Sequence, residues 1–207
     1  MKTRNLNFIL GFVIALCYGI VAGYQAYTYI SISINEMEYL LYLNEYGQIA
    51  NLIIGAIAYL ALAIFAVLFI VYNFIRRNPE VAYRGALIGL GSHSIIAGAL
   101  QIINVLTNIK SGSSASIDTR LLINGILVIL TGVGLIYAAV TKYAAKGRSI
   151  ALTTSMVLSV LYVVNFSMDI AKTHTFAVVD GMSILLLIAF ILMSLLAYNR
   201  RTYVTYY

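Results

Sequence analysis

Two rows of polar side chains lie within apolar segments of this chain or at their edge, and these side chains have the most scope for chemistry. In residues 85–108, GALIGLGSHSIIAGALQIINVLTN, helical spacing places four polar residues on one narrow arc: His93, Gln101, Asn104 and Asn108. In residues 155–169 the spacing gives a second row: Ser155, Ser159, Tyr162 and Asp169. Because unpaired polar groups are costly in hydrocarbon, each row should face a bundle interior, a cavity or a partner. The rows either line a solute pathway or hydrogen-bond to one another.

His93 has the chemically most versatile side chain of the first row. It lies nine residues after Arg84, hence about 13 Å into a membrane at about 1.5 Å per residue. A histidine near mid-depth is typical of a haem or metal ligand, a proton relay or a hydrogen-bonded structural residue. The second histidine, His174, belongs to a loop at another depth, so we expect no haem held by the pair, and no cofactor.

Several absences argue against an enzyme. The apolar segments contain no Asp, Glu, Lys or Arg, so a proton pump would lack its usual groups. Cys17 is the single cysteine, and neither HExxH nor GxxxxGK[ST] occurs. Ser92 and His93 are adjacent and point about 100° apart on a helix, so they cannot form a catalytic dyad. We therefore predict a non-enzymatic protein without catalytic, cofactor-binding or metal-binding residues.

The composition indicates an integral membrane protein. The 207 residues are 62% hydrophobic, with mean hydropathy +0.94 and one proline. Stretches of roughly 20 apolar residues cross a bilayer as helices. The sequence predicts an all-α fold, a single transmembrane domain over residues 1–207 with six transmembrane helices in a compact bundle, at approximately 7–30, 49–75, 85–109, 121–141, 149–168 and 181–199.

The basic residues predict the orientation of this bundle. Short loops rich in Lys and Arg are retained on the cytoplasmic side. Ten of the 13 basic residues fall on one side: Lys2, Arg4, Arg76, Arg77, Arg84, Lys142, Lys146, Arg148, Arg200 and Arg201. The others are Lys110, Arg120 and Lys172. We expect a multi-pass protein of the cell membrane with both termini cytoplasmic, whose spread-out positive charge contacts anionic lipid and no nucleic acid.

The first apolar segment carries small residues at every fourth position: Gly11, Ala15, Gly19 and Gly23. Such a face lets another helix approach closely, which matters where lipid removes the usual hydrophobic drive for association. The pattern predicts a packing interface. The neighbouring helix belongs either to this chain, which we favour, or to another.

The stretch NEMEYLLYLNEYGQ (residues 35–48) gathers three acidic residues and three tyrosines between the first two apolar segments. Helical spacing predicts a short interfacial helix on the outer face, with tyrosines at headgroup depth and carboxylates toward water. The segment serves as a membrane anchor or, alternatively, as a lid or docking surface made of Glu38, Tyr39, Tyr42, Glu45 and Tyr46.

These features favour a structural or accessory subunit of a larger membrane complex, with other membrane proteins as partners. The alternative is a small-solute transport protein. In its architecture, with six helices, both termini inside and the Gly11, Ala15, Gly19 and Gly23 spacing in the first helix, the chain is similar to the substrate-binding component of energy-coupling-factor vitamin transporters. That resemblance implies that residues 35–48 close over a solute bound by the two polar rows.

Overall fold

Six long α-helices make up the described part of the chain, which confirms the all-α prediction. The computed structural model describes residues 2–76, 78–110, 119–141, 144–173 and 178–199. The helices are α1 (Lys2–Tyr42), α2 (Tyr46–Arg76), α3 (Pro79–Lys110), α4 (Thr119–Val140), α5 (Ala144–Thr173) and α6 (Val178–Asn199). Each is long and apolar enough to cross a membrane.

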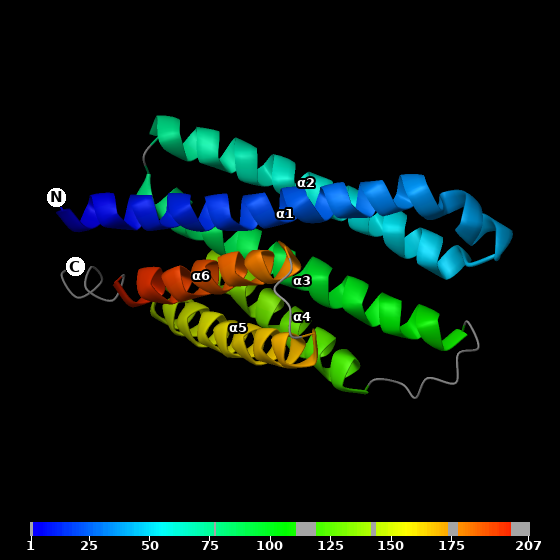
Figure 1. The fold of residues 1–207 in the computed structure, drawn as a ribbon. Coiled ribbons are helices and arrows are strands. Elements are labelled where there is room, and N and C mark those ends of the chain that lie inside the picture. Colours follow the sequence, from blue (N-terminus) through cyan, green and yellow to red (C-terminus); the bar gives the residue numbers. More distant parts are fainter. Residues whose placement is uncertain (1, 77, 111–118, 142–143, 174–177, 200–207) are drawn as a thin grey trace.

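Successive helices run in opposite directions, so α1, α3 and α5 begin at the end of the bundle where α2, α4 and α6 finish (Figure 1). α1 packs against α2, α3 and α6, and α3 packs against α4, α1 and α2. These two helices therefore form the centre of the bundle. The up-and-down arrangement brings the basic starts of α3 and α5 to the same end as the basic terminus of α2.

α1 is much longer than a membrane span requires. Its 41 residues extend about 60 Å at about 1.5 Å per residue. The helix stops in a Schellman motif: the Glu45 N–H donates to the Leu40 carbonyl (2.9 Å) and the Asn44 N–H donates to the Leu41 carbonyl (3.1 Å). Asn44 takes the left-handed conformation that this motif needs (φ 58°), which asparagine tolerates better than most residues.

The structure therefore corrects the expectation of a short separate helix at residues 35–48. Residues 35–42 are the last turns of α1, and α2 begins at Tyr46 after a three-residue turn. No glycine or proline occurs between Gly23 and Gly47 to interrupt the helix. The polar Ser33 is also compatible with a helix, because its hydroxyl donates to the Tyr29 carbonyl one turn earlier (2.7 Å). The result is a long hairpin of α1 and α2.

The small-residue face of α1 lies within the bundle. A methyl group on Gly11 would come 3.0 Å from the Ala82 side chain of α3, and one on Gly19 would come 2.9 Å from the Ala66 side chain of α2. Ala15 is fully buried. Gly23 has no such neighbour within 4 Å among the described residues. The motif thus lets α1 contact α3 and α2 at different heights.

The backbones of α3 and α4 also approach each other closely at two pairs of glycines. A methyl group on Gly98 would come 2.6 Å from the Gly125 carbonyl oxygen, and one on Gly91 would come 2.8 Å from the Gly132 carbonyl oxygen. The glycines of each helix are seven residues apart, so they pair in antiparallel order along one seam. Backbone stands against backbone there, and a side chain would force the helices apart.

This seam makes a specific prediction about stability. Gly98→Ala should lower the free energy of unfolding by about 1–3 kcal/mol, because the new methyl group overlaps a backbone atom that cannot rotate away. Gly23→Ala is the matched control, since a methyl group there meets nothing and alanine favours the helix by up to about 1 kcal/mol. Reversible unfolding in mixed detergent micelles measures both. A Gly98→Ala protein as stable as the parent would contradict the seam.

Candidate functional site

Gln101, a member of the polar row of α3, bonds to α4. Gln101 Nε2 donates to the Leu121 carbonyl of α4 (3.1 Å), and Asn124 Nδ2 donates to Gln101 Oε1 (3.2 Å). Asn165 Nδ2 of α5 donates in turn to Asn124 Oδ1 (3.1 Å). One chain of amides therefore ties α3, α4 and α5 together, and each link uses a donor on one helix and an acceptor on the next.

The polar row of α5 is satisfied mainly within its own helix and by α6. The Ser155 hydroxyl donates to the Ala151 carbonyl, and the Ser159 hydroxyl donates to the Ser155 carbonyl (2.9 Å). Ser194 of α6 donates to Ser155 Oγ (3.0 Å). A hydroxyl that donates to a carbonyl one turn earlier has its hydrogen-bond donor satisfied within its own helix. These serines are thus accommodated in a packed helix pair.

The remaining members of the two rows are spread over different surroundings. The Tyr162 ring packs at a tilt against Phe190 of α6, with 5.4 Å between ring centroids. Asn104 is exposed, and its carbonyl accepts a bond from the Thr107 hydroxyl (3.0 Å). The side chains of Asn108 and Asp169 lie outside the described part of the structure, as does His174. The described members of the two rows do not form a single site.

His93 is the least satisfied polar side chain that the sequence singled out. It is only 2% exposed, and neither ring nitrogen has a hydrogen-bond partner among the described residues. Its ring lies 5.7 Å from that of Tyr59, which lies 5.7 Å from that of Tyr29, so three aromatic rings cross from α3 through α2 to α1. The Tyr18 hydroxyl of α1 lies against Gly89, which is one turn before His93 on α3. This hydroxyl is likewise buried without a partner among the described residues. These atoms retain capacity for a hydrogen bond deep in the bundle.

A second candidate region is the hairpin of α1 and α2, at the end of the bundle opposite the N-terminus of α1. Its tyrosines are strongly exposed: Tyr42 by 83%, Tyr39 by 64% and Tyr46 by 64%. Tyr46 also donates through its hydroxyl to Asn44 Oδ1 across the turn (3.1 Å). Glu38 is exposed beside them, and Glu45, in the turn, is half-buried.

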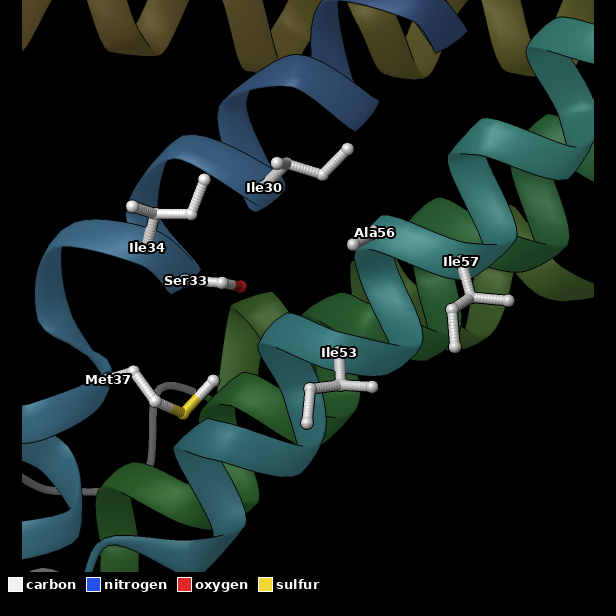
Figure 2. Close-up of a pocket in the computed structure, with 7 residues that line it drawn as sticks. All are labelled: Ile30, Ser33, Ile34, Met37, Ile53, Ala56 and Ile57. Atoms are coloured by element: carbon white, nitrogen blue, oxygen red, sulfur yellow. The ribbon is translucent and has the colours of Figure 1, made fainter.

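An apolar groove runs between the two helices of this hairpin. It is open to the surroundings, has a volume of about 340 Å³ and is lined by Ile30, Ser33, Ile34, Met37, Ile53, Ala56 and Ile57 (Figure 2). Four of these residues come from α1 and three from α2. The Ser33 hydroxyl is used within α1, so the groove presents methyl groups and a thioether rather than hydrogen-bonding groups.

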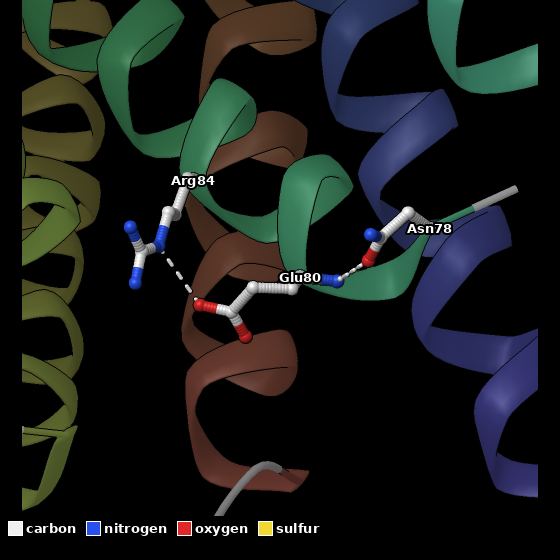
Figure 3. Close-up of polar contacts among 3 residues, drawn as sticks. All are labelled: Asn78, Glu80 and Arg84. Carbon is white, nitrogen blue, oxygen red and sulfur yellow. Dashed lines mark hydrogen bonds and ion pairs between the residues drawn. The ribbon is translucent and has the colours of Figure 1, made fainter. Parts of the chain in front are cut away.

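The opposite end of the bundle carries the basic charge. There Asn78 accepts a bond from the Glu80 N–H (3.0 Å) and caps α3, with Pro79 at its first position (Figure 3). Arg84 donates to Glu80 Oε1 one turn later (2.9 Å). Both side chains of this ion pair are exposed, so it adds less than about 1 kcal/mol. The ion pair, together with the Asn78 cap, stabilises the first turns of α3.

The described residues hold no group of three His, Cys, Asp or Glu side chains suited to a metal ion. The two predicted polar rows include Gln101 and Ser155 but not Asn124 and Ser194, which bond to them from α4 and α6. A signal for these was present. Asn124 and Ser194 are polar residues inside apolar segments, but each stands alone and forms no row.

The amide chain predicts a measurable loss on substitution. Asn124→Leu removes two bonds between helices and should destabilise the protein by about 1–2 kcal/mol, since such bonds in membrane bundles contribute about 0.6 kcal/mol each and an unpaired amide is left behind. Thr131→Val on the same helix is the control, because its hydroxyl bonds only to carbonyls of α4. Reversible unfolding in mixed detergent micelles would give the free energy of unfolding of each variant and of the parent. Equal stabilities would show that the amides do not hold the helices.

No protein-family model, curated protein or solved structure matches this chain. What the six long apolar helices support is a multi-pass membrane protein.

Proposed function

We propose that this chain is a non-enzymatic, structural or accessory subunit of a larger membrane complex. The observation that carries the proposal is the exposed, tyrosine-rich end of the α1–α2 hairpin. By the charge rule for loops, this end lies outside the cell and both termini lie in the cytoplasm. The basic helix ends then contact anionic lipid headgroups of the inner leaflet.

The length of α1 supports a hairpin that leaves the membrane. From Arg4 to Ile30 the helix rises about 39 Å, which already exceeds a hydrocarbon core of about 30 Å. Twelve more residues follow before α1 ends at Tyr42. α5 ends and α6 begins well short of the turn between α1 and α2 (Figure 1). The end of α3 reaches the hairpin on one side, where Thr107 lies against Gly47, and the tyrosine side chains of the hairpin stay exposed.

The composition of the hairpin end resembles that of a binding surface. Tyrosine is enriched where proteins meet, because it buries a large area and keeps a hydroxyl for a hydrogen bond. Tyr39, Tyr42 and Tyr46 stand with Leu41 and Leu43, and all five are exposed. A cluster of such side chains outside the bilayer would be costly in water, and a partner protein removes that cost.

The interior of the bundle favours this proposal over solute transport. Gln101, Ser155 and Ser159 use their polar groups within the chain. Residues 35–42 are the last turns of the continuous helix α1, so they form no separate segment that could close over a solute. The transport alternative is supported by buried polar atoms without a hydrogen-bond partner among the described residues, which include the ring nitrogens of His93, the Tyr18 hydroxyl and the Asn73 side chain. A solute held at His93 would have to hydrogen-bond within the aromatic row of Tyr59 and Tyr29.

Purification from the native membrane tests the proposal. In mild detergent, we expect other membrane proteins to co-purify in constant ratio, as mass spectrometry of the sample would show. Exchange of Tyr39 and Tyr42 together for serine should reduce their recovery about tenfold, because hot-spot tyrosines contribute about 2 kcal/mol or more when truncated. Tyr198→Ser is the control, since Tyr198 is also exposed but lies near the end of α6.

One result would count against the subunit role, and another would count against the hairpin end as its contact surface. The first is recovery of the chain alone with a reproducible bound solute that is lost on His93→Phe. The second is unchanged recovery of partners in the Tyr39 and Tyr42 variant together with loss in the Tyr198 variant, which would place the contact at the other end of the bundle.

A further inference from the structure

One face of α1 continues the apolar groove beyond the bundle. Residues seven apart on a helix lie nearly in line, and Tyr27, Ile34 and Leu41 have this spacing. They are exposed by 69%, 76% and 49%. Ile34 also lines the groove, across from Ile53 and Ile57 of α2 (Figure 2). The groove and this stripe form one elongated apolar surface, which we call the hairpin groove.

The charged side chains that the outer part of the hairpin itself supplies are all acidic. Glu38 follows Ile34 by one turn and by helical spacing lies on nearly the same face of α1, while Glu36 lies about 160° away from Ile34 around the helix. Both are exposed. The sequence contains no Lys or Arg between Arg4 and Arg76, so neither helix of the hairpin supplies a cation near these carboxylates. The groove thus combines an apolar floor with a negative rim.

The apolar floor and the negative rim together favour one of three possible occupants of the groove: a second copy of the chain, an anionic lipid or a basic helix of another protein. A second copy of the chain related by two-fold symmetry would bring Glu38 toward its own counterpart, and like charges repel. Anionic lipid headgroups would meet the same repulsion. An amphipathic helix with an apolar face and flanking Lys or Arg residues matches both the floor and the rim.

We propose that the hairpin groove binds a basic amphipathic helix of another protein on the outer side of the membrane. The proposal rests on the subunit role proposed above and adds the chemistry of the partner. Aliphatic side chains of the partner helix fill the space between α1 and α2 and pack on Ile34 and Ile57. Its cationic side chains meet Glu38 at the rim.

Photo-crosslinking in native membranes tests this. A benzoylphenylalanine at Ile34 reports on the groove, and one at Leu130, an equally apolar exposed position on α4, serves as the control surface. The expected result is a protein adduct at position 34. The sequence of the captured peptide should have the pattern of an amphipathic helix, with apolar residues three and four apart and Lys or Arg beside them. A lipid adduct alone, or a peptide of this same chain, would overturn the proposal.

Charge reversal then tests the rim. Glu38→Lys should lower the yield of the position-34 adduct at least about fivefold, because it replaces attraction by repulsion in a partly desolvated contact. Glu36→Lys should change it less than about twofold, since that carboxylate lies on the far side of the same helix. Exchange of the captured basic residues for glutamate should restore the yield with Glu38→Lys. Equal effects of the two variants would contradict the assigned rim.

The two proposals fail in different ways. A protein adduct at Leu130 with none at Ile34 would leave the subunit role standing and place the partner on another face, which refutes the hairpin groove as its site. Absence of protein adducts at both positions, with no co-purifying proteins, would refute both proposals.

Discussion

The thickness of the bilayer is the constraint on which the rest of this structure depends. A hydrocarbon core of about 30 Å needs about 20 helical residues, and α4 and α6, at 22 residues each, match it closely. Because lipid offers little hydrophobic drive for helices to associate, close approach must replace it. The paired glycines of α3 and α4 and the small residues of α1 supply that approach. The hairpin of α1 and α2 is the part that exceeds the bilayer, and it is where we place the function.

The hydrocarbon core of the bilayer contains no water, and this explains how the polar residues are arranged. Inside the bundle, amides of α3, α4 and α5 bond to one another, and serines of α5 bond to carbonyls of their own helix. Such groups hold helices in register and leave few atoms for a ligand. His93 is the contrast, since its ring is buried against Tyr59 with both nitrogens unpartnered among the described residues. The described amides and serines of these helices are thus used within the chain, and we place the contact with other molecules at the exposed hairpin.

The six helices could be predicted from sequence because charged residues are excluded from the hydrocarbon core, and their absence is visible without any knowledge of contacts. The continuation of α1 through residues 35–42 could not, because a straight helix and a bent pair have the same composition there. The glycine seam was missed for a related reason. Gly91 and Gly98 acquire their meaning only when Gly125 and Gly132 are known to stand opposite. The sequence can indicate that a face is small, but the pairing of two such faces is a property of the fold.

The most direct test of the account is a depth scan along α1 in the purified protein, reconstituted in vesicles. With Cys17 replaced by alanine, single spin labels at four exposed positions of one face, Ile20, Tyr27, Ile34 and Leu41, step outward by about 10 Å each. We predict that oxygen reaches the labels at 20 and 27 more readily than a water-soluble nickel complex, and that nickel prevails at 34 and 41. Oxygen-dominated relaxation at all four positions would place the whole hairpin in lipid and contradict the account.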